Sequence, residues 1–184
     1  MSLDTLRERL PAYAKDLSLN LSSLAAETVL TDQQTWGAFA ASAYAVGEPS
    51  VIQAIETSAR AAGLSDAALT AAKSAAAIMG MNNVYYRALH LISNPEYRTL
   101  PARLRMNALA NPGVEKVDFE LWATAVSAVN GCGMCLDAHE AELKKAGVST
   151  QQIQAALRIS AVVNALSRVL AAEAASAPSQ ALAA

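Results

Sequence analysis

Two cysteines and one histidine lie within eight residues of each other and could carry thiol redox chemistry. They belong to the segment Cys132-Gly133-Met134-Cys135, with His139 four residues further on. If this segment is helical, residues three and four apart share one face, with Cβ atoms roughly 5–6 Å apart. That separation is compatible with a disulfide, and the imidazole would lie one turn beyond Cys135 in the same pocket.

The position of the two sulfurs along the helix bears on their reactivity. The nucleophile is the thiolate, and a free thiol has a pKa of about 8.5. Asn130-Gly131 is a turn signal that ends one helix, so the next begins at or near Cys132. The unpaired N–H groups and positive dipole end of that helix would stabilise S⁻. His139 can then act as a base toward Cys135 or pair with its thiolate.

A carboxylate on the preceding helix could complete this group. If the turn folds that helix back antiparallel, Glu120 could accept a proton from His139, directly or through water, and set its tautomer. Three other glutamates compete for the role, namely Glu115, Glu140 and Glu142. The residue types alone do not choose among the four.

Two other interpretations of the cysteines remain open. They could be ordinary buried side chains, because free cysteine is among the most buried residue types. They could also bind zinc with His139, but a structural zinc site needs four ligands and His90 is the only other histidine. We expect no bound metal or cofactor, a structural role for His90, and packing roles for Met79, Met81 and Met106.

Helix start and stop signals divide the chain into helices, and no alternating β-branched run predicts a strand. The expected fold class is therefore all-α, in a single domain of residues 1–184. The expected helix starts are Asp4, Pro11, Thr31, Ser50, Ser65, Asp118, Cys132 and Ser149. The expected breaks are Gly47, Gly63, Asn94-Pro95, Asn130-Gly131 and Gly147, with a connector over 93–117 that holds a short helix near 104–110.

Apolar spacing predicts which side of each long helix is buried. The predicted face of the helix after Ser65 consists of Ile78, Met81, Tyr85, Ala88 and Ile92. The later helices have the stripes Trp122, Val126 and Val129, and Ile159, Val162, Leu166 and Val169. The tail after Ala174 is rich in Ala, Ser and Pro, and we expect it to fray.

The two halves of the chain, roughly 31–92 and 118–174, resemble each other. The stretch 62–66 (Ala-Gly-Leu-Ser-Asp) echoes 146–150 (Ala-Gly-Val-Ser-Thr). Trp36 is echoed by Trp122, and Asn83-x-x-x-Arg87 by Asn164-x-x-x-Arg168, at slightly different spacings. Because the echoes keep the same order, they suggest an internal duplication. Only the second copy carries cysteines, so we place the chemistry in the C-terminal half.

Composition excludes several classes of protein. With 14 basic and 16 acidic residues and no basic cluster, the chain is not expected to bind nucleic acid. Its longest charge-free internal stretch, 121–136, is shorter than the roughly 20 apolar residues of a membrane span. The start, MSLDTLRERL, lacks a secretory apolar region, so a cytoplasmic protein is expected. The 53% hydrophobic content suggests that some surface is buried between subunits.

These residues together make the sequence similar to the AhpD-type alkylhydroperoxidases of the carboxymuconolactone decarboxylase-like superfamily. The central pattern is C-x-x-C-x3-H with a glutamate twelve residues before the first cysteine. The similarity extends over nearly the whole chain, through the stretches 14–16, 19–23, 79–87, 104–107, 110–113 and 119–122. The pattern points to the superfamily, and the longer stretches point to the AhpD branch.

The resemblance implies a duplicated all-α fold, assembled as a homotrimer, that reduces alkyl hydroperoxides. In the family, the residue that matches Cys135 becomes a sulfenic acid, and the one that matches Cys132 donates a proton and then closes the disulfide. The residues that match His139 and Glu120 form a proton relay. The resemblance also implies reduction of an AhpC-type peroxiredoxin, and re-reduction by the dihydrolipoyl group of a lipoyl-bearing dihydrolipoamide acyltransferase.

One residue departs from this family pattern, because Met134 stands where members often carry a histidine. Methionine supplies neither the positive potential nor the extra proton carrier of that histidine. Two alternative functions stay open from the sequence. One is a dedicated disulfide reductase that passes electrons from a lipoyl protein to a peroxiredoxin, and the other is a non-catalytic metal-binding module.

Overall fold

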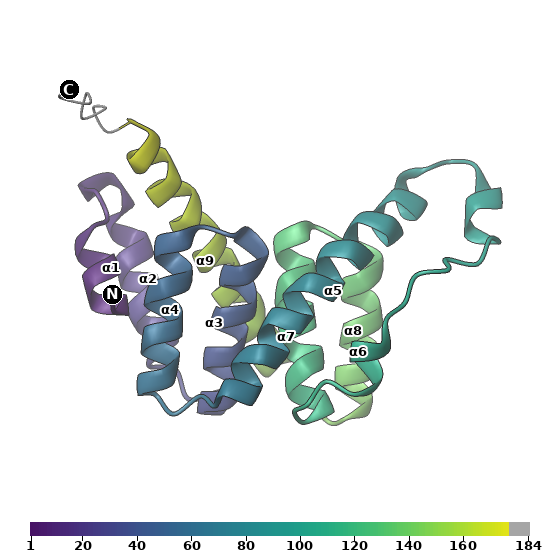
Figure 1. The fold of residues 1–184 in the computed structure, drawn as a ribbon, viewed down its shortest axis with the longest axis horizontal. Helices are drawn as coiled ribbons and strands as arrows, with labels where there is room; N and C mark the ends of the chain where they lie inside the picture. Colours follow the sequence, from purple (N-terminus) through teal and green to yellow (C-terminus); the bar gives the residue numbers. More distant parts are fainter. Residues whose placement is uncertain (177–184) are drawn as a thin grey trace, which may run out of the picture.

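Helices make up the regular secondary structure of residues 1–176, the part of the chain that the computed structural model describes, and no strand occurs there (Figure 1). In order they are α1 (Leu3–Glu8), the 3-10 turn η1 (Ala12–Ala14), α2 (Lys15–Ala25), α3 (Asp32–Val46), α4 (Pro49–Ala61), α5 (Asp66–Leu91), the 3-10 turn η2 (Pro95–Arg98), α6 (Asn107–Ala110), α7 (Lys116–Asn130), α8 (Gly133–Lys145) and α9 (Thr150–Ser176). The predicted all-α class is confirmed. Of the tail that we expected to fray, residues 177–184 lie outside the described part.

Polar caps and glycines set several helix boundaries where we expected them. The Thr31 hydroxyl accepts a hydrogen bond from the Gln34 backbone N–H at 3.2 Å, and the Gln34 side chain accepts one from the Thr31 N–H at 3.2 Å. This reciprocal pair is a capping box at the start of α3. Gly47 ends the same helix in the left-handed conformation, with φ 84°. Ser65 caps α5, and Ser149 accepts from the N–H three residues on at the start of α9.

Three expected helix starts near the N-terminus are wrong by a few residues. Ser2, not Asp4, caps α1, because its hydroxyl accepts the backbone N–H of Thr5. Pro11 precedes a 3-10 turn, and α2 begins only after that turn. Glu48, not Ser50, caps α4, with Pro49 as the first helical residue. A proline fits there because the first N–H of a helix has no partner inside the helix.

Asp118 is not the cap of α7, as predicted, but lies inside the helix and is buried. Its carboxylate accepts hydrogen bonds from the side chains of Gln33 at 2.6 Å and Gln34 at 2.9 Å. Both glutamines belong to the first turn of α3. Asp118 therefore connects the starts of two neighbouring helices, α3 and α7. The residue at the N-cap position of α7 is Glu115.

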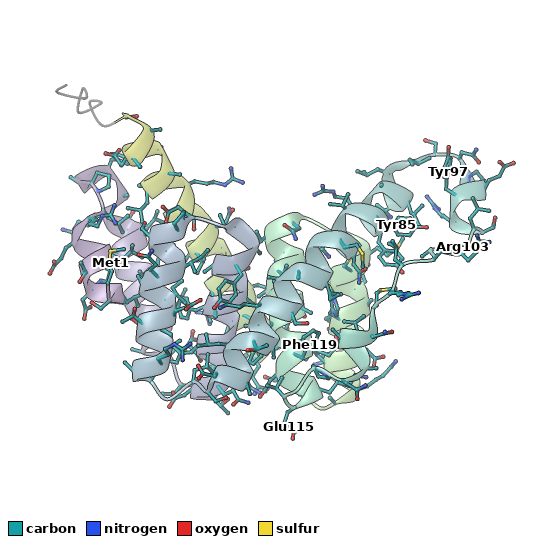
Figure 2. The ribbon with its side chains drawn as sticks, in the orientation of Figure 1. Met1, Tyr85, Tyr97, Arg103, Glu115 and Phe119 are labelled. Carbon is teal, nitrogen blue, oxygen red and sulfur yellow. A yellow bond between two sulfur atoms is a disulfide. The ribbon has the colours of Figure 1, made fainter. Side chains whose placement is uncertain are left out.

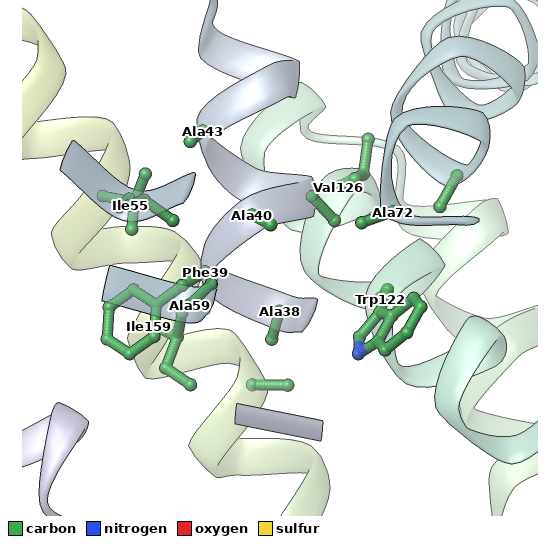
Figure 3. Close-up of a cluster of buried hydrophobic side chains, with 14 of the residues drawn as sticks. Ala38, Phe39, Ala40, Ala43, Ile55, Ala59, Ala72, Trp122, Val126 and Ile159 are labelled. Atoms are coloured by element: carbon green, nitrogen blue, oxygen red, sulfur yellow. The ribbon is translucent and has the colours of Figure 1, made fainter. Parts of the chain in front are cut away.

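Helices α3 and α7 form the centre of the fold, with α5 and α9 packed against both (Figures 1 and 3). Trp122 on α7 and Phe39 on α3 are among the largest fully buried side chains. The Trp122 indole N–H donates to the backbone oxygen of Gln34 at 3.2 Å, and its ring lies directly over Gly37. Because Gly37 has no side chain, α3 and the indole can approach this closely.

The predicted buried face of α5 is wrong. Ile78, Met81 and Tyr85 are only partly buried, and Ala88 and Ile92 are exposed. The buried positions of α5 are mostly alanines between Ala68 and Ala76, followed by Met79, Asn82 and Asn83. The last turns of α5, with η2 and the chain that returns to α6, extend away from the rest of the helices (Figures 1 and 2). Val84, Leu91, Tyr97 and Leu100 are exposed on this extension.

The order and lengths of the helices repeat along the chain. α3 begins at residue 32 and α7 at 116, which is 84 residues later, and the same spacing relates α4 to α8 and α5 to α9. The positive-φ glycines Gly47 and Gly63 also recur at this spacing, as Gly131 and Gly147. Trp36 then corresponds to Glu120 and not to Trp122. The predicted duplication stays a prediction, supported by the helices more than by the tryptophans.

Helix α9 is long and apolar enough, by length and composition, to cross a membrane. This helix is not among the long charge-free stretches of the sequence, because Arg158 and Arg168 lie within it. In the structure its buried residues include Ile159, Val163 and Leu166, and the helix packs against α2, α3 and α7. Helices in the core of a folded domain can have the same length and apolar composition as a membrane span.

Candidate active site

The turn between α7 and α8 places Cys132 at the start of α8, as the sequence predicted. Gly131 ends α7 in the left-handed conformation, with φ 67°, and the Cys132 N–H donates to the backbone oxygen of Ser127 at 3.1 Å. Cys132 is the N-cap, since its sulfur accepts the backbone N–H of Cys135 at 3.3 Å. Both sulfurs therefore lie at the amino end of a 13-residue helix, where N–H groups favour negative charge.

A network of polar side chains, buried at Asn83 and Ser127, fixes this turn against α5. The Asn83 side chain donates to the Ser127 hydroxyl at 3.0 Å and accepts from the Asn130 amide at 2.9 Å. Arg87, one turn further along α5, donates to the backbone oxygen of Asn130. The residues that position the cysteines thus come from both halves of the chain. Nothing in the local pattern around Cys132 indicated this anchor.

The structure contains a disulfide between Cys132 and Cys135, with Cα atoms 5.3 Å apart. Cys132 is fully buried, and Cys135 has an exposed fraction of 6%. The expectation that the two sulfurs share one side of a helix start is confirmed. Cys135 is the sulfur that borders a cavity, so a small molecule reaches it and not Cys132.

Glu120 is the glutamate that contacts His139, among the four candidates. Its carboxylate Oε2 lies 2.7 Å from His139 Nδ1, and both side chains are 12% exposed. Glu115 is the N-cap of α7 and Glu140 is exposed. This geometry makes Nδ1 the donor to the carboxylate and so fixes the orientation of the ring. The other nitrogen, Nε2, lies 3.2 Å from the Met79 sulfur in this disulfide form.

A cavity of about 280 Å³ opens in front of Cys135. Its lining residues are Met79, Asn82, Tyr86, Met106, Leu109, Met134, Cys135, Ala138 and His139. Most of this surface is apolar, which suits an alkyl group. From the sequence we expected Met79 and Met106 only to pack against other side chains. In the structure both also form walls of this cavity. Met134, at the position that departs from the family pattern, lines it as well.

A second cavity, of about 210 Å³, lies on the other side of Glu120. Its charged lining residues are Lys116, Glu120, Glu142 and Lys145. Lys145 hydrogen-bonds to Glu142 and, together with Lys116, lowers the pKa of that carboxyl. The Glu120–His139 pair therefore connects an apolar cavity that contains the reactive sulfur with a charged one.

The matching positions in the first half of the chain carry no such chemistry. At the 84-residue spacing, Cys135 and His139 correspond to Val51 and Ile55, both fully buried. Within residues 1–176 no group of three or more His, Cys, Asp or Glu side chains is arranged to hold a metal ion. His90 is exposed near the end of α5.

Comparison with known proteins shows close relatives over almost the whole chain. Residues 95–177 match the carboxymuconolactone decarboxylase family. The chain is 68% identical over 175 residues to the alkyl hydroperoxide reductase AhpD of Hyphomonas neptunium, which covers 95% of this chain and 97% of the relative. It is 66% identical to that of Maricaulis maris, over 94% and 99%, and 56% identical to that of Bradyrhizobium sp., over 97% and 98%.

Proposed function

The chain belongs to the AhpD alkyl hydroperoxide reductases of the carboxymuconolactone decarboxylase family, and from that membership we propose that Cys132 and Cys135 are the groups that reduce the hydroperoxide. The proposal is supported by the way the two cysteines, the cavity and the His139–Glu120 pair lie together. A disulfide-forming pair lies at a helix N-terminus, its outer sulfur borders an apolar cavity, and a histidine held by a carboxylate lines the same cavity.

The reaction begins with removal of the Cys135 proton by His139, with Glu120 stabilising the resulting imidazolium. The thiolate attacks the terminal oxygen of the hydroperoxide. A sulfur–oxygen bond forms, the oxygen–oxygen bond breaks, and the alkoxide takes a proton from the Cys132 thiol. The Cys132 thiolate then attacks the sulfenic acid of Cys135 and displaces hydroxide, which takes the proton held by His139 and leaves as water. The products are the alcohol, water and the disulfide.

Oxidation of the reduced protein with one equivalent of cumene hydroperoxide tests this proposal. The chain is expected to lose two hydrogen atoms, about 2 Da, because a dithiol becomes a disulfide. The loss should map to the tryptic peptide 117–144, which contains both cysteines. One cumyl alcohol should form for each disulfide. Unchanged mass, or an oxygen added elsewhere in the chain, would contradict the proposal.

The Glu120–His139 pair is proposed as the proton relay, and Glu120→Gln tests it. The amide keeps a hydrogen bond to the ring but loses the negative charge that stabilises an imidazolium. We expect the rate of oxidation by hydroperoxide to fall by about 10- to 100-fold, within the range for general acid–base catalysis. Glu140→Gln, an exposed neighbour of His139, is the matched control and should react as the unsubstituted protein does. Equal rates for the two variants would exclude the relay.

The apolar cavity favours direct reduction of alkyl hydroperoxides over a role only as a disulfide reductase. A partner disulfide needs an accessible sulfur, whereas Cys132 is buried and Cys135 is 6% exposed at the edge of a cavity sized for a small molecule. Exchange with a protein partner is still part of the proposal. We propose an AhpC-type peroxiredoxin as an electron acceptor and a lipoyl-bearing acyltransferase as the electron donor, both in the cytoplasm.

Assembly as a homotrimer is also proposed. Its structural support is the extension formed by the end of α5 and the chain that follows it. Tyr97 lies on this extension (Figure 2), and Val84, Leu91 and Leu100 also expose apolar surface. Exposed apolar patches of this kind mark surfaces that bind other subunits.

A further inference from the structure

The cavity in front of Cys135 is lined by three parts of the chain that differ in how firmly they are packed. α8 contributes Cys135, the sulfur assigned to the attack on the peroxide. α5 contributes Met79 and Asn82, which are only 1% and 4% exposed and so belong to the interior. The third part is the short helix α6 with the residue before it, and it contributes Leu109 and Met106. These last two side chains, here called the α6 wall, supply apolar surface and no group for the chemistry.

The two residues of the α6 wall lie three positions apart on a single helical turn, which follows the chain that returns from the extension (Figure 1). The Leu109 N–H donates to the Met106 backbone oxygen at 3.0 Å, and residues at this spacing share one helix face. No residue of α6 is buried, and Met106 makes no side-chain cap hydrogen bond. Segments with few buried contacts are displaced at low cost, and methionine adapts its shape to its surroundings. The α6 wall can therefore adjust to alkyl groups of different shape.

We propose that the α6 wall determines which hydroperoxides the protein prefers, with Met106 and Leu109 contacting the alkyl group of the substrate. This inference rests on the dithiol mechanism proposed above. The oxygen–oxygen bond has to lie at Cys135 for the sulfur to attack it, so the alkyl group occupies the part of the cavity away from α8. Because Met79 and Asn82 are buried, the accessible surface in that part comes from the α6 wall and from Tyr86, all of which are partly exposed.

The size of the substrate decides how much of this contact is made. The cavity has a volume of about 280 Å³, whereas a water molecule takes roughly 30 Å³ in the liquid. Hydrogen peroxide has only two oxygen atoms, so at Cys135 it leaves most of the cavity unfilled and makes little contact with the α6 wall. A hydroperoxide with a phenyl or branched alkyl group fills more of the cavity and buries apolar surface against the wall. The α6 wall therefore favours bulky, apolar hydroperoxides over hydrogen peroxide.

Leu109→Ala tests the inference when the reduced protein is oxidised by three peroxides of different size. We expect the second-order rate with cumene hydroperoxide to fall by about tenfold, the lower end of the effect of a missing methylene in an apolar pocket. The rate with tert-butyl hydroperoxide, which has a smaller alkyl group, should fall by about threefold. The rate with hydrogen peroxide should stay within twofold. Each rate is divided by that of the unsubstituted protein with the same peroxide, so the intrinsic reactivities of the three peroxides cancel.

Two further variants serve as controls. Leu109→Met keeps a similar volume and should retain all three rates within twofold. Leu104→Ala makes the same truncation on the chain just before α6, at a partly buried residue that does not line the cavity, and should react as the unsubstituted protein does. Leu109 also packs against the hydrophobic core, so Met106→Ala makes the same test, with the same expected pattern, if Leu109→Ala does not fold.

The inference is overturned if the truncated α6 wall leaves the rate with cumene hydroperoxide within twofold of the unsubstituted rate. It is also overturned if all three peroxides slow equally, which would indicate a structural role, or if Leu104→Ala shows the same selective loss. Failure of the unsubstituted protein to form the disulfide with any of the three peroxides would instead contradict the proposed function.

Discussion

Replacing Cys135 with serine is expected to lower turnover of alkyl hydroperoxides by about a thousandfold or more. A serine hydroxyl is not ionised near neutral pH and does not form a disulfide, so both the attack on the peroxide and the closing step are lost. Loss of a covalent nucleophile has effects of this order or larger in other enzymes. Peroxide consumption in the presence of excess dithiol measures the change. Retention of full activity would show that another group reduces the peroxide.

Cys132→Ser is the partner variant that separates attack from disulfide closure. Serine remains a good N-cap residue, so the start of α8 should be preserved. The Cys135 thiolate should still react once with cumene hydroperoxide and stop as a sulfenic acid. The mass is then expected to rise by about 16 Da, one oxygen atom, and the product should react with dimedone. If Cys132→Ser forms no sulfenic acid at residue 135, the assignment of Cys135 as the attacking sulfur is wrong.

Replacing Gly37 with alanine is expected to destabilise the fold by more than about 3 kcal/mol. A Cβ atom at this position would lie 2.0 Å from Trp122 Cε2 and 2.1 Å from Cζ2. The indole cannot move aside easily, because it is fully buried and its N–H is hydrogen-bonded to α3. For a chain of this size the thermal midpoint should fall by roughly 10 °C. Calorimetry or circular dichroism on heating measures it.

Gly80→Ala is the matched control for the loss of a glycine from a helix. A Cβ at Gly80 would meet nothing within 4 Å, and alanine is preferred to glycine inside a helix by roughly 0.5–1 kcal/mol. This variant should therefore be as stable as the unsubstituted protein or slightly more stable. Should Gly37→Ala not fold at all, adding Trp122→Phe should recover soluble protein by opening space. A Gly37→Ala protein with an unchanged midpoint would contradict the close packing of α3 on the indole.

Helix boundaries could be predicted well where a local group determines them. Thr31, Gly47 and Gly131 were assigned correctly because a cap or a left-handed glycine acts within one turn of its own position. The C-x-x-C-x3-H spacing could be interpreted for the same reason, since it depends only on the pitch of one helix. The error at Ser50 arose because the nearby Glu48 caps the helix instead. At Asp118 the N-cap position lies three residues earlier, at Glu115, which makes no side-chain cap hydrogen bond. Asp118 itself is taken up by two glutamines from α3.

The buried face of α5 was misjudged because alanine carries little apolar signal. Large side chains such as Ile78 and Tyr85 dominated the pattern, yet α5 packs its alanines against α3 and α7, as Figure 3 shows for Ala72. Ala75 is fully buried as well. Small residues allow helices to approach closely, so they are favoured at the centre of a packed bundle. The larger side chains are then left toward the surface and the extension.

The sequence by itself determined the all-α class, most helix ends and the three groups of the Cys132–His139 segment, because each depends on neighbours within a few residues. Only the tertiary structure selected Glu120 from four glutamates, brought Met79 to His139, and placed Asn82 at the wall of the cavity that Cys135 borders. These contacts join residues from 19 to 60 positions apart. Such pairings follow from how the helices pack together, and no local spacing along the chain contains that information.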